Sequence, residues 1–249
     1  MRWSPSKVNN RTDLNWLTQW EYAHRGLHGD RVPENSLQGA KLAIEAGLGI
    51  ECDIQRSRDD QPMVFHDWEL SRLIGVQDDV ADLDSSDLQR LHYRNSIEHP
   101  VTLGQLLELI NGSVPLLIEI KSRRGYDVVR SCKIVADAVA GYHGHYAVMS
   151  FDPRVARWFR RYSAGTIAGL VMREDDEGFT QKPWQRWLAY WFAKPDFLAY
   201  HIAALPNPWV ARLRAKGLPI LTWTVNSPET RQCALANTDA LIAEGAGLA

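Results

Sequence analysis

Short apolar, β-branched stretches alternate with longer stretches of helical periodicity from Tyr22 to the end of the chain. The pattern predicts nine strands, at 22–24, 50–54, 62–66, 116–120, 146–150, 166–171, 197–201, 219–225 and 240–243. It predicts helices at 36–46, 102–109, 126–140, 152–162, 181–192, 208–216 and 228–236. No Gly/Ser linker interrupts the alternation, so we expect a single domain over 1–249.

The third predicted strand differs from the other eight. Parallel neighbours need a crossover of about a dozen residues, whereas only residues 55–61 separate this strand from the second one. We therefore expect 62–66 to be the return arm of a hairpin, followed by a polar insertion over 67–100 with a short helix near 84–91. The remaining eight strands predict an α/β fold, a (β/α)8 TIM barrel, although an open doubly wound sheet would show the same alternation.

Composition and charge set only broad bounds. With 45% hydrophobic residues and a formal charge of −2, the chain gives no reason to expect nucleic acid or an anionic membrane as a partner. Three scattered cysteines without CxxC spacing argue against a disulfide framework and a thiolate zinc site. No signal-peptide pattern and no apolar run of roughly 20 residues is present. We expect a cytoplasmic protein without a transmembrane segment; peripheral membrane contact and the oligomeric state stay open.

Two predicted strands carry charged residues on one face. Side chains alternate across a strand, so Glu51 and Asp53 share one face of 50–54, and Glu119 and Lys121 share one face at the end of 116–120. Apolar residues on the opposite face would pack against the outer helices, which turns the charges toward the mouth of the barrel. Three converging carboxylates repel one another unless a cation lies among them. Oxygen ligands favour Mg²⁺ or Ca²⁺; the alternative for each acid is a salt bridge to a barrel lysine.

Two histidines lie where a predicted strand meets a loop, His24 in AHRG and His66 in VFHD. Histidine titrates near neutrality, so such a pair can take a proton from an attacking group and give one to a leaving oxygen. Arg25 and Lys121 add positive charge at the same strand ends, which suits a phosphate. The other histidines, His28 among them, lie in loops without a comparable setting and are interpreted as structural or exposed, while His201 stays undecided.

The order and spacing of these motifs resemble the glycerophosphodiester phosphodiesterase family. The motifs are AHRG at 23–26, PENS at 33–36, ECD at 51–53, VFHD at 64–67 with Leu70 and Arg72, IEIK at 118–121, LTWTVN at 221–226 and DALI at 239–242. Three departures, at Cys52, at 73–74 and at 100–103, leave the proposed catalytic groups untouched and put the specificity for the alcohol in doubt.

The resemblance implies a (β/α)8 barrel that hydrolyses glycerophosphodiesters to glycerol 3-phosphate and an alcohol. It further implies one divalent cation, Mg²⁺ or Ca²⁺, held by the residues matching Glu51, Asp53 and Glu119, with His24 and His66 as acid and base. Arg25 and Lys121 would bind the phosphate. In the resembling motif, Trp223 is expected to line the glycerol pocket. Acid and base are not distinguished by the sequence, nor is water distinguished from a substrate hydroxyl as the nucleophile.

Other functions stay open. They are a lysophospholipase D-like enzyme acting on acylated substrates, a barrel that binds phosphodiesters without turnover, and a metal-dependent aldolase or isomerase. Trp184, Trp187 and Trp191 recur at helical spacing within 181–192. We interpret them as part of a helix packed on the barrel, in preference to a contact with a membrane or an acyl chain.

Overall fold

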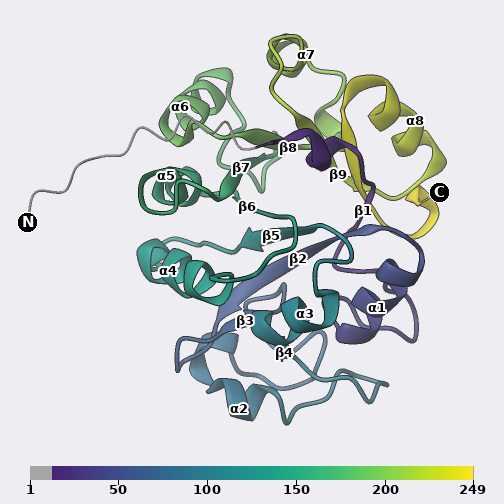
Figure 1. The fold of residues 1–249 in the computed structure, drawn as a ribbon, viewed down its shortest axis with the longest axis vertical. Helices are drawn as coiled ribbons and strands as arrows, with labels where there is room; N and C mark the ends of the chain where they lie inside the picture. The colour runs from purple at the N-terminus through teal and green to yellow at the C-terminus, as the bar shows by residue number, and fades with distance from the viewer. Residues whose placement is uncertain (1–12, 249) are drawn as a thin grey trace, which may run out of the picture.

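The computed structural model describes residues 13–248 (Figure 1). Residues 1–12, on which the expectation of no signal peptide rests, lie outside the described residues. The strands are β1 (Tyr22–Ala23), β2 (Gly49–Arg56), β3 (Pro62–Val64), β4 (Val101–Thr102), β5 (Leu116–Ile120), β6 (Tyr146–Ser150), β7 (Ile167–Met172), β8 (Phe197–His201), β9 (Ile220–Val225) and β10 (Ala240–Ala243). The α-helices are α1 (Leu37–Glu45), α2 (Ser85–Leu88), α3 (Leu103–Ile110), α4 (Val128–Ala138), α5 (Pro153–Tyr162), α6 (Pro183–Ala193), α7 (Pro208–Arg214) and α8 (Pro228–Asn237).

Eight parallel strands close into a ring. The hydrogen-bonded order is β1-β10-β9-β8-β7-β6-β5-β2, and β2 pairs back to β1. Helices surround this ring, with α4, α5 and α6 stacked along one side and α8 beside β1 (Figure 1). The predicted barrel is therefore confirmed, and the open sheet is excluded because β1 has a neighbour on both edges.

The two other strands, β3 and β4, lie off the ring. β3 pairs antiparallel with the C-terminal end of β2, as the hairpin prediction required, and β4 pairs antiparallel with β3. The sequence did not predict β4, because two residues are too few to show a periodic pattern. The insertion that follows β3 has a small core of its own, formed by Met63, Phe65, Leu70, Val80, Leu88 and Tyr93.

The alternation along β2 and β5 separates two environments. Ile50, Cys52 and Ile54 belong to the cluster between the sheet and the outer helices. The cluster inside the ring contains Leu117 of β5 together with Trp16, which precedes the first strand. The inside of the barrel is thus apolar near the N-terminal ends of the strands. The acids of β2 and β5 occupy inward positions nearer the C-terminal ends.

Local sequence signals fix where the helices begin. The Ser36 hydroxyl accepts a hydrogen bond from Gly39 N, and Thr102 forms a capping box with Gln105. Four helices begin at a proline, the residue whose missing N–H costs nothing at that position: Pro153, Pro183, Pro208 and Pro228. Within 13–248, no helix has the length and apolar character needed to span a bilayer.

Candidate active site

Three buried carboxylates converge at the mouth of the barrel. Glu51 and Asp53 come from β2 and Glu119 from the adjacent β5, where Asp53 and Glu119 are register partners. Their exposed fractions are 2%, 2% and 8%, and one oxygen from each lies within 4.8 Å of the others. The closeness follows from the sequence, because parallel register aligns the inward positions of neighbouring strands.

The two acids of β2 have pKa values shifted in opposite directions. Burial, followed by repulsion from Asp53 and Glu119, raises the pKa of Glu51 well above its ordinary value. Burial acts in the same direction on Asp53, but attraction to Lys121, His66 and Arg25 outweighs it and holds the pKa of Asp53 low. Arg25 acts in the opposite direction on Glu51, through its charge and its backbone N–H, but does not offset the burial and the repulsion.

Two cations contact the acids. Lys121 Nζ lies 3.3 Å from Asp53 Oδ1 and 3.0 Å from Glu119 Oε1, and Arg25 Nε lies 3.3 Å from Asp53 Oδ2. The alternative of a salt bridge to a barrel lysine is thus present in the structure. Three carboxylates nevertheless face two cations, so the negative charges outnumber the positive ones. Among residues 13–248, Glu119 Oε1 is buried without a well-oriented hydrogen bond, since its contact with Lys121 is ionic only. An all-oxygen donor set with surplus negative charge fits a hard divalent cation.

The segment after β1 adopts an uncommon backbone conformation to reach these acids. Arg25 and Asn35 both have positive φ, 56° and 57°, which side-chain-bearing residues rarely adopt. From there, Arg25 N donates to Glu51 Oε2 at 3.0 Å, and Asn35 Nδ2 donates to Asp53 Oδ2 at 3.0 Å. Such conformations persist where the surroundings enforce them, and here they orient two of the three carboxylates.

His66 is held by a chain of charged groups. Its Nδ1 lies 2.7 Å from Asp67 Oδ1, and Arg72 bridges Asp67 to Glu34. Although burial raises the pKa of Asp67, hydrogen bonds from His66 and Arg72 lower it well below its ordinary value. Gln55 donates to the backbone oxygen of His66 at 3.1 Å. The imidazole orientation is therefore fixed from both its side chain and its backbone.

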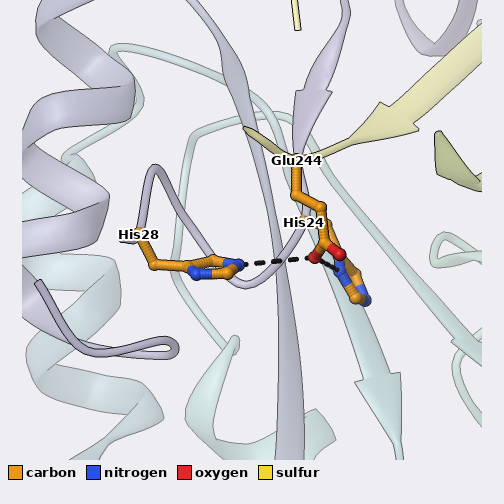
Figure 2. Close-up of side chains that lie close together, drawn as sticks. All are labelled: His24, His28 and Glu244. Carbon is orange, nitrogen blue, oxygen red and sulfur yellow. Dashed lines mark hydrogen bonds and ion pairs between the residues drawn. The ribbon is translucent and has the colours of Figure 1, made fainter. Parts of the chain in front are cut away.

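His24 is held in a matching way at the other side of the mouth. Its Nδ1 lies 2.6 Å from Glu244 Oε2, and His28 Nε2 approaches the same oxygen at 3.4 Å (Figure 2). The hydrogen bond from His24, then the 3.4 Å contact with His28, lowers the pKa of Glu244 well below its ordinary value. Two ligands of one tetrahedral Zn²⁺ lie about 3.3 Å apart, given bonds of about 2.0–2.1 Å. The 2.6 Å contact is thus a hydrogen bond that orients His24, and it does not have the geometry of a metal site.

Charged side chains connect the surroundings of His24 with those of His66, although His66 is not among the residues that line the cleft beside His24. Glu34 connects their surroundings, because it pairs with Arg25 beside His24 and with Arg72 beside Asp67. A cleft of about 580 Å³ is lined by His24, Arg25, His28, Glu34, His201, Ile202, Ala203, Thr224, Asn226, Thr230 and Glu244.

Trp223 is placed differently from the other predicted residues. Its indole ring lies 4.8 Å from the ring of His201 and 5.3 Å from that of Phe151, and its Nε1 donates to Ala199 O. Its neighbour Thr224 lines the cleft, whereas Trp223 is not among the lining residues. Its expected role at the glycerol pocket stays a prediction.

Several residues of the site were not assigned a role from the sequence. They are the carboxylates that orient the histidines and their partners: Glu34, Asp67, Glu244 and His28. One signal could have found Glu244. It directly follows the last predicted strand, and closure of a barrel places that strand beside the first, which ends at His24. His28, interpreted from the sequence as structural or exposed, contacts Glu244.

Comparisons with known proteins agree with this geometry. The sequence model of the glycerophosphoryl diester phosphodiesterase family matches residues 24–246. Glycerophosphodiester phosphodiesterase 1 of Bos taurus is 24% identical over 238 residues, covering 82% of this chain and 71% of its own length. A glycerophosphodiester phosphodiesterase of Caldanaerobacter subterraneus is 24% identical, covering 89% of this chain and 92% of its own length.

Solved structures give the same result. A glycerophosphodiester phosphodiesterase from Thermotoga maritima has a TM-score of 0.73 at 25% identity, covering 89% of this chain and 92% of its own. A phosphodiesterase from Oleispira antarctica, in complex with the product sn-glycerol-3-phosphate, has a TM-score of 0.76 at 22% identity and shares the fold. That alignment covers 90% of this chain and 92% of the other.

Proposed function

Because the chain belongs to the glycerophosphoryl diester phosphodiesterase family, we propose that it hydrolyses glycerophosphodiesters to glycerol 3-phosphate and an alcohol at the mouth of the barrel. The observation that carries the proposal is the juxtaposition of a buried acid triad with two histidines, each oriented by its own carboxylate. Binding a phosphodiester without turnover requires positive charge but not two oriented imidazoles, so this arrangement favours an enzyme over a binding module.

Glu51, Asp53 and Glu119 would hold one divalent cation, Mg²⁺ or Ca²⁺. Such an ion, when bound, supplies positive charge that neutralises a phosphoryl oxygen and offsets the surplus charge of the triad. Arg25 and Lys121 already contact the acids through part of their donors. Both side chains have further N–H groups for the substrate phosphate, so they position the diester next to the acids.

The two histidines divide the proton transfers. Each histidine places Nδ1 against its own carboxylate, Glu244 for His24 and Asp67 for His66, which leaves Nε2 for proton transfer. Of the two, we assign His24 as the base that takes the proton of the nucleophile. His66 is the acid, and Asp67 at 2.7 Å stabilises its protonated ring. One P–O bond forms to the nucleophile as the bond to the alcohol breaks, and the proton from His66 goes to the departing oxygen.

The proposal is tested by measuring glycerol 3-phosphate released from glycerophosphocholine and glycerophosphoethanolamine, with Mg²⁺, Ca²⁺ or excess EDTA. We expect metal-dependent release, reduced by roughly 100-fold or more in His24→Ala and in His66→Ala. His92→Ala, which alters an exposed histidine of the insertion, is the matched control and should keep full activity.

Two further readouts separate the alternatives. ³¹P NMR during turnover distinguishes a cyclic phosphate, made by the neighbouring glycerol hydroxyl, from direct attack by water. Turnover of lysophosphatidylcholine tests the alternative that the protein is a lysophospholipase D-like enzyme. If a doubly substituted His24→Ala, His66→Ala protein kept near-normal turnover, this mechanism would be wrong.

A further inference from the structure

Helix α6 presents large apolar side chains to solvent. The exposed fractions of Trp184, Trp187, Leu188 and Trp191 are 61%, 58%, 48% and 57%. Their spacing of three and four residues places them on one face of the helix, where the rings of Trp187 and Trp191 stack at 6.4 Å. Phe179, in the connection that precedes the helix, is 79% exposed. The helix itself packs on the barrel, as the sequence interpretation expects, but the side chains of these tryptophans face solvent.

The opposite face anchors α6 to the barrel. Arg186 and Ala193 are buried, and Arg186 Nη1 donates to Glu174 Oε2 at 2.6 Å and to Gln181 O at 2.7 Å. The helix is thus held firmly while its tryptophans face outward. Contiguous exposed apolar patches of this kind are uncommon on soluble proteins and mark interaction surfaces.

Positive charge borders the tryptophan face. Helix α5, which packs beside α6, contains four arginines and no acidic residue over Pro153–Tyr162. Arg157 Nη1 donates to Phe192 O and Arg160 Nη1 to Lys194 O, each at 3.4 Å, so two of these arginines lie at the end of α6. Lys182 and Lys194 flank the helix itself. The connection before α6 is acidic over 174–177, but Asp175 and Glu177 pair with Arg173, and Glu174 pairs with Arg186. The arginines of α5 with Lys182 and Lys194 therefore leave positive charge beside the helix, although the whole chain has a formal charge of −2.

Aromatic side chains beside basic ones match the surface of an anionic bilayer. Tryptophan concentrates at the membrane–water interface, where its ring is partly apolar and its N–H meets the headgroups. Lysine and arginine nearby are attracted to anionic lipids. A second copy of this chain fits less well, because joining two such faces would bring their arginines and lysines together.

The same face adjoins the mouth of the barrel. The connection from β7 to α6 begins at Arg173, which lies 5.7 Å from the ring of Trp223, and its Asp175 lies 3.5 Å from His201. Phe179 belongs to this connection. A surface that contacts the tryptophan face would therefore lie close to the open end of the barrel.

We propose that the face formed by Phe179, Trp184, Trp187, Leu188 and Trp191, with Arg157, Arg160, Lys182 and Lys194, docks peripherally on anionic phospholipid bilayers. The docking is independent of the chemistry proposed above. It brings the mouth of the barrel to a surface on which phosphodiester lipids and their deacylated products are found.

The test is co-sedimentation of the full-length protein with vesicles of phosphatidylcholine alone and of phosphatidylcholine mixed with phosphatidylglycerol. We expect binding to the mixed vesicles, at least about tenfold tighter than to phosphatidylcholine alone and weakened by salt. Brominated lipids should quench tryptophan emission, because the exposed indoles enter the interface. Trp187→Ala with Trp191→Ala should abolish binding to both vesicles, and Arg157→Gln with Arg160→Gln should remove the preference for the anionic lipid.

Leu235→Ala, at a residue of α8 that is 61% exposed, is the matched control and should bind like the original protein. Turnover of soluble glycerophosphocholine should be unchanged in all these variants, which separates docking from catalysis and shows that each variant is folded. Absence of binding to the mixed vesicles would overturn the proposal. So would a concentration-dependent dimer in light scattering that the tryptophan substitutions dissolve, since the occupant would then be a second copy.

Discussion

Two clusters of charged residues lie at the mouth of this barrel, one of three acids and one of a single acid with two histidines, and the negative charge is compensated differently in each. The triad of Glu51, Asp53 and Glu119 is almost fully buried and has more negative than positive charges. Glu244, by contrast, is 30% exposed and contacts two histidines. Both clusters arise at the C-terminal ends of parallel strands, so the difference lies in burial and partners.

The difference indicates what each cluster can do. A buried triad without enough compensating charge is suited to receive a cation, because only an added positive charge removes the repulsion. A carboxylate already satisfied by imidazole N–H groups has no such need, and its effect is to orient the ring that transfers a proton. In the proposed mechanism, the same residue type would thus bind metal on one strand pair and position a histidine on another.

The largest effect is expected from Asp53→Asn, a substitution within the triad. This substitution keeps the shape but removes a charge from the triad, and we expect kcat/KM to fall by about 10³-fold because cation binding is weakened. Isothermal titration with Mg²⁺ or Ca²⁺ should show the matching loss of affinity. Glu108→Gln, at an exposed acid of α3, should change neither quantity. Unaltered cation affinity in Asp53→Asn would place the metal elsewhere.

A smaller effect is expected at the other cluster. Glu244→Gln keeps an oxygen that can accept from His24 but removes the charge, so we expect kcat to fall on the order of tenfold with little change in KM. Cation affinity should be unaffected, in contrast to Asp53→Asn. A large rise in KM with kcat unchanged would show that Glu244 contacts substrate and does not act through His24.

Removing a charge from the triad should raise the stability of the folded protein when no cation is bound. In EDTA, Glu51→Gln removes the charge that burial and Asp53 oppose, so we expect Tm to rise by about 2–4 °C per kcal/mol of repulsion relieved. In saturating Mg²⁺ or Ca²⁺, the original protein should gain more in Tm than the variant, because the variant has lost a ligand. Differential scanning calorimetry measures both. A lower Tm for the variant in EDTA would show that the repulsion is already relieved without a cation.

The smallest effect is a pH dependence of stability. The folded-state pKa of Glu244 is lowered from its ordinary value of 4.5, so its contribution is present above that pH and is lost as pH falls below it. Glu244→Gln should therefore be less stable than the original protein near neutrality, and the difference should shrink progressively as the pH falls below about 5. Urea unfolding at several pH values tests this. A difference that grew on acidification would contradict the depressed pKa.

Much of the fold and most of the site follow from short-range patterns. The alternation in β2 and β5 predicted that Glu51, Asp53 and Glu119 share the inner face, because a strand with one apolar face has only one way to pack. The short link 55–61 predicted that β3 is a hairpin arm. Strand β4 was not predicted, because its two residues pair with β3 only when the insertion folds back.

What the sequence by itself determined is the set of barrel strands, the inward direction of the acids and the positions of His24 and His66 at strand ends. These depend on periods of two and 3.6 residues, which are local. Only the tertiary structure decided that Glu244 meets His24, 220 residues away in the chain, and that the tryptophans of α6 face solvent. Both depend on closure of the ring and on which side of a helix the barrel covers, and a local pattern of residue types does not contain that information.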